Sequence, residues 1–200
     1  MKSDKVIITD EYIVLKENTR SVVMSKGAKS ITEIYSYIVC QNKGDVLDVG
    51  FGMGFSANKM LELADTYTCI EINPQIYETA KEWAKDKPNV TIIFGDWIDI
   101  IPTLDKKFDG IFFDTHNDSN SHLAEEYVKL VSKEGTIFSH WNYFQIRDIE
   151  ELNMYKCSVD TNSMPKLTNS IHYINWTYYI DGKFKKTNNK INFHGGTKVI

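Results

Sequence analysis

Cysteine and proline are scarce in this sequence, with three Cys and four Pro among 200 residues. Cys40, Cys69 and Cys157 are widely spaced and lie in apolar surroundings, so we expect buried reduced thiols rather than a disulfide framework. A formal charge of -4 argues against general attraction to nucleic acids or anionic membranes. No apolar run reaches 18 residues and no signal peptide is recognisable, so a cytoplasmic protein without a membrane partner is expected.

Internal repeats, low-complexity stretches and interdomain linkers are also absent. A length of 200 residues with 42% hydrophobic and 12% aromatic content suits one packed domain. Short apolar strands alternate with segments of helical period, which predicts an α/β fold with a doubly wound, mostly parallel sheet. We expect this domain over residues 31–200. Residues 1–30 carry no clear fold signal and are expected to form a lid or extension.

Helices are predicted where apolar residues recur on one face. The first such face, before any clear strand, consists of Ile31, Ile34, Tyr35 and Ile38. The signals weaken after about residue 140. The features expected there are a helix over 142–153, a strand near 157–159, a strand within 171–180, and a hairpin turn at Asp181-Gly182 followed by a returning strand at 183–185.

A turn with alternating glycines follows the apolar strand that ends at Val49. Gly50, Gly52 and Gly54 have no Cβ, so the backbone there can turn sharply and approach a ligand closely. The helix that follows directs its free N–H groups toward the turn. This arrangement suits a nucleotide or nucleoside cofactor, and its alternative is an ordinary strand–helix turn.

The spacing of the turn separates two cofactor classes. A dinucleotide fingerprint requires its third glycine at position 55, which is Phe55 here. Asp48 would repel a pyrophosphate, but it suits an ammonium group. S-adenosylmethionine carries an ammonium and a sulfonium and no phosphate, so the sequence favours this cofactor and S-adenosylhomocysteine as its product.

Acidic residues also close the next three expected strands. Glu71 lies 21 residues after Gly50, the distance at which an acid accepts hydrogen bonds from ribose hydroxyls. Asp96 is placed to accept from an adenine amino group while Trp97 covers the ring. Asp114 ends the fourth strand. Because parallel strands present their carboxyl ends at one edge, these acids predict a single ligand crevice.

Several sequence runs together resemble guanidinoacetate N-methyltransferase, a family of class I S-adenosylmethionine-dependent methyltransferases. The resemblance extends over about residues 44–140. Its runs are Val49-Gly50-Phe51-Gly52-Met53, Glu82-Trp83-Ala84, Pro102-Thr103-Leu104, Phe108-Asp109-Gly110-Ile111 and Asp114-Thr115. The resemblance implies a Rossmann-like sheet of about seven strands, the last of them antiparallel.

The resemblance also implies roles for individual residues. Asp114 matches the family residue that binds guanidino nitrogens beside the methyl donor. The family has a second substrate-binding glutamate where this sequence has Ala28, and a tyrosine where it has His116. The residues expected to bind the cofactor are Met24, Asp48, Gly50, Phe51, Gly52, Met53, Gly54, Glu71, Ile72, Asp96, Trp97 and Asp114.

Methyl transfer to nitrogen is therefore the predicted reaction, with a small guanidino or amino compound or a peptide side chain as acceptor. Asp114 and His116 are the expected catalytic residues, and Asp114 orients and deprotonates the acceptor nitrogen. The motifs of base-modifying amino-methyltransferases are absent, so a nucleic acid acceptor is not expected. No resident metal is expected. Two alternatives stay open: O-methylation through His116 or a metal at Asp114, Asp118 and His140, and a catalytically silent cofactor-binding regulator.

Overall fold

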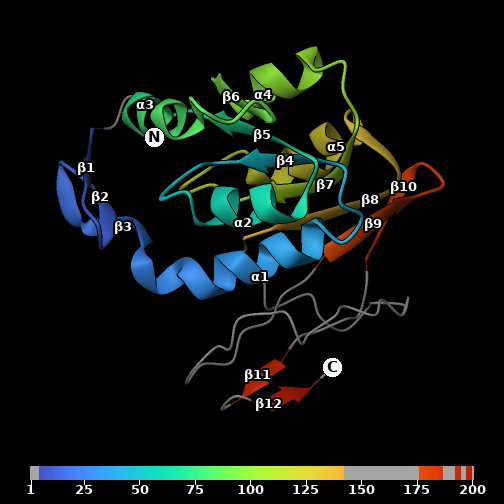
Figure 1. Ribbon diagram of the computed structural model, residues 1–200, viewed down its shortest axis with the longest axis horizontal. Coiled ribbons are helices and arrows are strands. Elements are labelled where there is room, and N and C mark those ends of the chain that lie inside the picture. Colours follow the sequence, from blue (N-terminus) through green and yellow to red (C-terminus); the bar gives the residue numbers. More distant parts are fainter. Residues whose placement is uncertain (1–4, 142–175, 187–191, 195–196, 200) are drawn as a thin grey trace.

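A computed structural model of the protein describes residues 5–141, 176–186, 192–194 and 197–199 (Figure 1). Its strands are β1 (Val6–Ile8), β2 (Tyr12–Leu15), β3 (Asn18–Ser25), β4 (Asp45–Val49), β5 (Thr66–Glu71), β6 (Val90–Phe94), β7 (Phe108–Phe113), β8 (Ser132–His140), β9 (Trp176–Ile180), β10 (Lys183–Lys186), β11 (Asn192–His194) and β12 (Thr197–Val199). Its helices are α1 (Lys29–Val39), α2 (Phe55–Leu63), α3 (Pro74–Ala84), α4 (Trp97–Ile100) and α5 (Ala124–Lys129), with short 3-10 turns η1 (Lys26–Ala28), η2 (Ile101–Thr103) and η3 (Ser121–Leu123).

The central sheet has the strand order β10-β9-β8-β7-β4-β5-β6. The strands from β8 to β6 in this order are mutually parallel. The chain winds outward from β4 through β5 to β6 and then returns to place β7 on the other side of β4. This confirms the predicted doubly wound, parallel α/β fold, and it creates a switch point between β4 and β7 where open α/β sheets bind ligands.

Helices cover both faces of this sheet. α1, α2 and α3 contribute to one buried cluster, and the expected apolar face of α1 is buried within it. α4 and α5 contribute to a second cluster on the opposite face. α3 begins where Asn73 caps it, because the side chain of Asn73 accepts hydrogen bonds from the backbone N–H groups of Gln75 and Ile76, and Pro74 stands at the first turn.

The N-terminal segment forms a three-stranded antiparallel sheet, which the sequence did not reveal. Its strands β1, β2 and β3 lie beside the start of α1 (Figure 1). Val6 and Ile13 bury their side chains in the first cluster. The side chain of Gln75 on α3 accepts from the backbone N–H of Val6 at 2.9 Å and donates to its carbonyl at 3.4 Å. This sheet is thereby joined to the main domain.

The predicted hairpin at Asp181-Gly182 is confirmed, since β9 and β10 pair antiparallel on either side of it. β9 also pairs antiparallel with β8, at the side of the sheet opposite β6. The helix expected over 142–153, the strand expected near 157–159 and residues 171–175 lie outside the described residues. In the part of the chain that the structure describes, no helix has the length and apolar character needed to cross a bilayer.

Candidate functional site

The structure brings three of the predicted acidic residues to the carboxyl edge of the sheet, namely Glu71, Asp96 and Asp114. Val49 pairs with Ile70 of β5 on one side and with Phe113 of β7 on the other. The N–H of Gly50 donates to the carbonyl of Ile70 at 2.9 Å, and the N–H of Asp114 donates to the carbonyl of Val49 at 2.8 Å. Strand pairing thus fixes the glycine turn between the ends of β5 and β7.

Glycine is required in this turn because the backbone takes conformations that other residues rarely adopt. Gly50 has φ +100°, and a Cβ added there would lie 2.3 Å from the carbonyl oxygen of Asp114. Gly52 has φ +53°, and its Cβ would lie 2.7 Å from Sδ of Met24. Gly54, with φ +74°, caps α2. The turn therefore packs directly against Asp114 and Met24.

Glu71 ends β5 beneath the turn and is 3% exposed. Its Oε2 accepts from the N–H of Phe51 at 2.8 Å, and its Oε1 accepts from the N–H of Asn73 at 2.7 Å. Burial raises the pKa of Glu71, while these backbone donors oppose the rise. The carboxylate thus links the glycine turn to the cap of α3. The backbone N–H groups of Gly52 and Ile72 also donate toward this carboxylate, so a ligand hydroxyl would share its oxygens with four backbone donors.

Asp48 is fully buried within β4. Its Oδ2 accepts from the hydroxyl of Ser56 at 2.7 Å and from the hydroxyl of Tyr67 at 2.8 Å. Its Oδ1 is buried without a hydrogen-bond partner among the described residues. Burial raises the pKa of Asp48 to about 8, against these two hydrogen bonds, and the charges of Asp114 and Glu71 add to the rise. The predicted contact with an ammonium group would require movement of the residues that cover Asp48.

Asp114 is half-buried at the end of β7. Its Oδ2 is buried, and no described residue forms a hydrogen bond with it. Burial and, second, the charge of Glu71 raise the pKa of Asp114 to about 7. Tyr35 of α1, which stacks on Phe112 at 4.9 Å, has its pKa raised by burial and by Asp114. Tyr35 thus lies in the core, close enough for the charge of Asp114 to act on it, and its sequence pattern indicated only the core position.

His116 follows Asp114 by two residues and is half-buried. Its Nε2 is buried without a hydrogen-bond partner among the described residues. Burial lowers the pKa of His116 below its usual value, so the imidazole is neutral at neutral pH. A neutral imidazole can donate or accept one hydrogen bond at Nε2, depending on its tautomer.

The residues predicted for the adenine side lie where β6 ends. Asp96 caps α4, and its Oδ1 accepts from the N–H of Ile98 at 3.2 Å. Trp97 is 4% exposed, and its indole packs edge-on against Phe113 and Tyr127 rather than presenting an open face. In this arrangement Trp97 acts as a core residue, and covering of an adenine ring by it stays a prediction.

Met24 of β3 lies over the glycine turn, where its Sδ accepts from the N–H of Met53 at 3.2 Å. This places the N-terminal sheet against the predicted cofactor loop, while its action as a lid stays a prediction. Ile72 is half-buried directly after Glu71. Across the described residues, no three His, Cys, Asp or Glu side chains gather as a set that could hold a metal ion.

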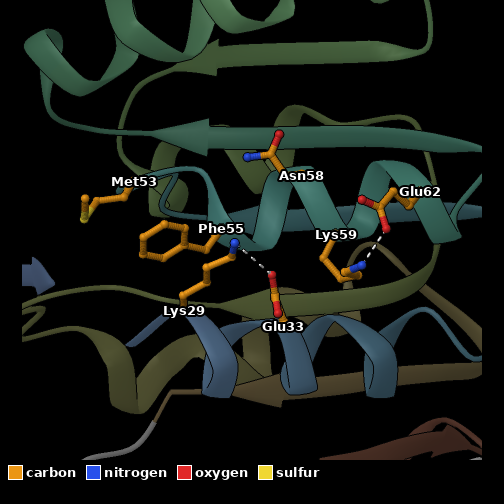
Figure 2. A pocket seen from close by; sticks show the side chains of 7 residues that line it. All are labelled: Lys29, Glu33, Met53, Phe55, Asn58, Lys59 and Glu62. Atoms are coloured by element: carbon orange, nitrogen blue, oxygen red, sulfur yellow. Dashed lines mark hydrogen bonds and ion pairs between the residues drawn. The ribbon is translucent and has the colours of Figure 1, made fainter. Parts of the chain in front are cut away.

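A groove of about 340 Å³ lies between α1 and α2 (Figure 2). Its lining residues are Lys29, Glu33, Met53, Phe55, Asn58, Lys59 and Glu62. Lys29 pairs with Glu33, and Lys59 pairs with Glu62, so its charges offset one another. The predicted carboxylates of the strand ends are not among its lining residues, and Met53 is the one predicted cofactor-binding residue that lines it.

The raised pKa of Asp48 predicts a pH-dependent stability. A carboxyl with an ordinary pKa of 3.8 in the unfolded chain and about 8 in the native state favours folding only while protonated. Its contribution is therefore present below pH 3.8 and is lost as the pH rises toward 8. Between pH 5 and 8 the wild type should lose up to about 1.4 kcal/mol of unfolding free energy per pH unit from this group, whereas Asp48→Asn should not. The variant's stability relative to the wild type should therefore increase with pH. Urea unfolding across this range measures the difference, and parallel profiles would contradict the prediction.

Comparison with known proteins identifies the family. The family model for guanidinoacetate N-methyltransferase matches residues 19–140. A protein arginine N-methyltransferase 2 from Saccharomyces cerevisiae is 30% identical over 148 residues, covering 66% of this chain and 35% of the relative. The one from Eremothecium gossypii is 31% identical over 169 residues, covering 72% of this chain and 41% of the relative. The chain therefore spans less than half the length of these curated relatives.

Solved structures agree on the fold. A spermidine synthase from Thermotoga maritima superposes with a TM-score of 0.50 at 17% identity, covering 68% of this chain and 55% of that chain. At this level of identity the similarity shows the Rossmann-like fold alone. The family match spans the glycine turn, Glu71, Asp96 and Asp114, the residues that the structure places along one edge of the sheet. The chain belongs to the guanidinoacetate N-methyltransferase family, within the class I S-adenosylmethionine-dependent methyltransferases.

Proposed function

We propose that this chain is the catalytic domain of an N-methyltransferase that transfers a methyl group from S-adenosylmethionine to a guanidino nitrogen. The acceptor is a small guanidine or the arginine side chain of a peptide. Guanidinoacetate and arginine, which appear in the names of the family and of the relatives, share this group. The observation that carries the proposal is the buried Oδ2 of Asp114, which has no partner among the described residues at the end of β7.

The residues along the carboxyl edge of the sheet support S-adenosylmethionine as the cofactor. The close approach of Gly50 to the carbonyl of Asp114 requires glycine and fixes the turn beside the end of β7, where the ligand is expected. Glu71 would accept from the ribose hydroxyls, which would share its oxygens with the backbone donors of the glycine turn. Asp48 would pair with the ammonium group once the residues that cover its buried carboxyl move, and Asp96 would accept from the adenine amino group. When bound, S-adenosylmethionine supplies an electrophilic methyl group on its sulfonium.

Asp114 would act on the acceptor in two ways. Its carboxylate orients a guanidinium through a charge-assisted hydrogen bond, which holds one nitrogen in line with the methyl group. As the N–C bond forms and the S–C bond breaks, the same carboxylate receives the proton that the nitrogen loses. A group with a pKa near 7 suits this role, because it is substantially ionised at neutral pH and can still hold a proton.

His116 and Ala28 distinguish this chain from the family pattern. The neutral imidazole of His116 stands where the family has a tyrosine, and Ala28 of η1 replaces a second acidic residue. A guanidinium bound here would therefore pair with the carboxylate of Asp114, while the Nε2 of His116 provides a second, uncharged contact.

Calorimetric titration with S-adenosylmethionine and S-adenosylhomocysteine tests the cofactor site. Glu71→Ala is expected to weaken both affinities at least about tenfold, because it removes acceptors for the ribose and for the N–H of Phe51. Glu71→Gln keeps the side-chain volume and one acceptor, so it should show a smaller loss if the variant protein remains folded. Glu82→Ala is the matched control, because it makes the same substitution at an exposed glutamate. Absence of binding to the wild type would refute the cofactor assignment.

Turnover assays then test the acceptor class. S-adenosylhomocysteine formation should appear with guanidinoacetate or with an arginine-containing peptide, and it should be absent with the matching lysine peptide. Turnover only with hydroxylated acceptors would favour the O-methylation alternative. Cofactor binding without any turnover on guanidines, amines or hydroxylated compounds would favour the silent regulator.

A further inference from the structure

The loop after β7 is organised by one side chain, that of Asp118. Residues 114–120 connect β7 to the turn η3 and carry both predicted catalytic residues. Oδ1 of Asp118 accepts from the N–H of Asn120 at 2.9 Å, and its carbonyl accepts from the N–H of Ser121 at 3.3 Å. Oδ2 of Asp118 accepts from Nε1 of Trp97 at 2.7 Å. Asp118 thus holds the loop's own turn and also attaches the loop to α4.

Trp97 contacts residues that precede and follow Asp114 in the chain. Its ring packs edge-on against Phe113, with centroids 5.2 Å apart, and Phe113 directly precedes Asp114. Its N–H reaches Asp118, four residues after Asp114. Tyr127 of α5 packs edge-on against the indole from another side, also at 5.2 Å. The position of this indole therefore constrains the backbone that presents the catalytic carboxylate.

This contact joins the segments that follow β6 and β7. Trp97 follows β6, whereas Asp118 follows β7, and β4 and β5 lie between these strands in the sheet. The glycine turn follows β4, and Glu71 ends β5. A buried indole N–H needs an acceptor, and a carboxylate is a strong one. The adenine side and the acceptor side of the crevice are thus joined by one short, partly buried hydrogen bond.

We propose that Trp97 is a positioning residue for methyl transfer, whose hydrogen bond to Asp118 holds the loop carrying Asp114 and His116 in place when the adenine side is occupied. This inference rests on the proposed function, since it assigns the neighbouring Asp96 to the cofactor. Trp97 acts through Asp118 and Phe113 and does not itself contact the reacting atoms.

Hydrogen exchange with S-adenosylhomocysteine as the ligand tests the coupling without a methyl acceptor. The reporters are the amides of Asn120 and Ser121, because both donate to Asp118. In the wild type the ligand should slow their exchange at least about tenfold. Trp97→Phe keeps an aromatic ring but removes the N–H donor, so the ligand should no longer slow these amides appreciably. Asp118→Asn leaves one oxygen acceptor for two donors, Nε1 of Trp97 and the N–H of Asn120, so it should also lose much of the protection.

Trp83→Phe is the matched control. The indole N–H of Trp83 donates to Oδ1 of Asn58 at 3.0 Å in an exposed contact between α3 and α2, so its loss should leave the protection of Asn120 and Ser121 intact. If the ligand slows amides of the glycine turn but those of Asn120 and Ser121 respond equally in the wild type and in Trp97→Phe, the positioning role is wrong while the cofactor site stands. If the ligand protects no amide in the wild type, the proposed function fails and the positioning role falls with it.

Discussion

Replacing Asp114 by asparagine is expected to lower kcat by about 10²–10⁴-fold, the range over which a positioned general base acts. Asparagine has nearly the same volume and keeps one oxygen acceptor, but it neither carries the charge that pairs with a guanidinium nor accepts its proton. The affinity for S-adenosylhomocysteine should change little, because the backbone of residue 114, which packs against Gly50, is unchanged. Turnover and calorimetry on the same preparation measure the two quantities.

The pH dependence of the wild type provides an internal check on this assignment. A base acts in its ionised form, and the pKa of Asp114 in the free enzyme is raised to about 7 by burial and by Glu71. The value of kcat/KM should therefore increase as the pH rises toward 7 and level off above it. In Asp114→Asn this limb should disappear together with most of the rate.

Asp105→Asn and His116→Gln serve as comparisons for Asp114→Asn. Asp105→Asn makes the same chemical change at an exposed loop position and should retain wild-type turnover. If Asp114→Asn retained the rate while His116→Gln lost it, His116 would be the base, and a hydroxyl acceptor would become the better hypothesis. Retention of the rate in both variants would remove this loop from the chemistry.

The fold and the crevice follow from patterns that are local in the sequence. β5 ends at Glu71, β7 leads into Asp114 and β4 leads into the glycine turn, and parallel pairing necessarily places their carboxyl ends at one edge. The alternating glycines are visible in the sequence as well, although the atoms that exclude a Cβ at Gly50 and Gly52 belong to the distant Asp114 and Met24. These features were therefore predictable from the sequence alone.

The N-terminal sheet was not predictable for the opposite reason. Most residues of β3 are exposed or half-buried, so its hydrophobic pattern is weak. Its attachment depends on distant partners, since Gln75 binds the backbone of Val6 across 69 residues. Tyr35 was recognisable as a buried residue of α1, but its position near Asp114 depends on how α1 packs on the sheet.

The orientation of the Trp97 ring was also not predictable from the sequence. Its place beside Asp96 suggested a cover for adenine, but the indole turns into the core because Phe113, Tyr127 and Asp118 together offer it two ring edges and a charged acceptor. These partners come from 16, 30 and 21 residues further along the chain. Secondary-structure patterns do not determine which of several surroundings such an aromatic side chain enters.

Gly50→Ala is expected to reduce the affinity for S-adenosylhomocysteine by at least about 100-fold, equivalent to about 2.7 kcal/mol. The new Cβ would lie 2.3 Å from the carbonyl oxygen of Asp114. Neither atom can rotate away, because the backbone fixes the position of a Cβ as well as that of a carbonyl oxygen. The turn must therefore separate from the end of β7 or lose the hydrogen bond from Gly50 to Ile70. Either movement displaces the ligand-binding turn relative to Asp114.

Gly135→Ala separates this clash from backbone strain. Gly135 also has a positive φ, +85°, but a Cβ there would meet no atom within 4 Å. It should lose about 1–2 kcal/mol of stability from the strained conformation and keep its affinity for the ligand. Gly50→Ala should lose affinity beyond any such loss of stability, as measured by calorimetry and urea unfolding of both variants. Equal affinities in the two variants would show that the turn accommodates a side chain, and that its contact with Asp114 is not what shapes the cofactor site.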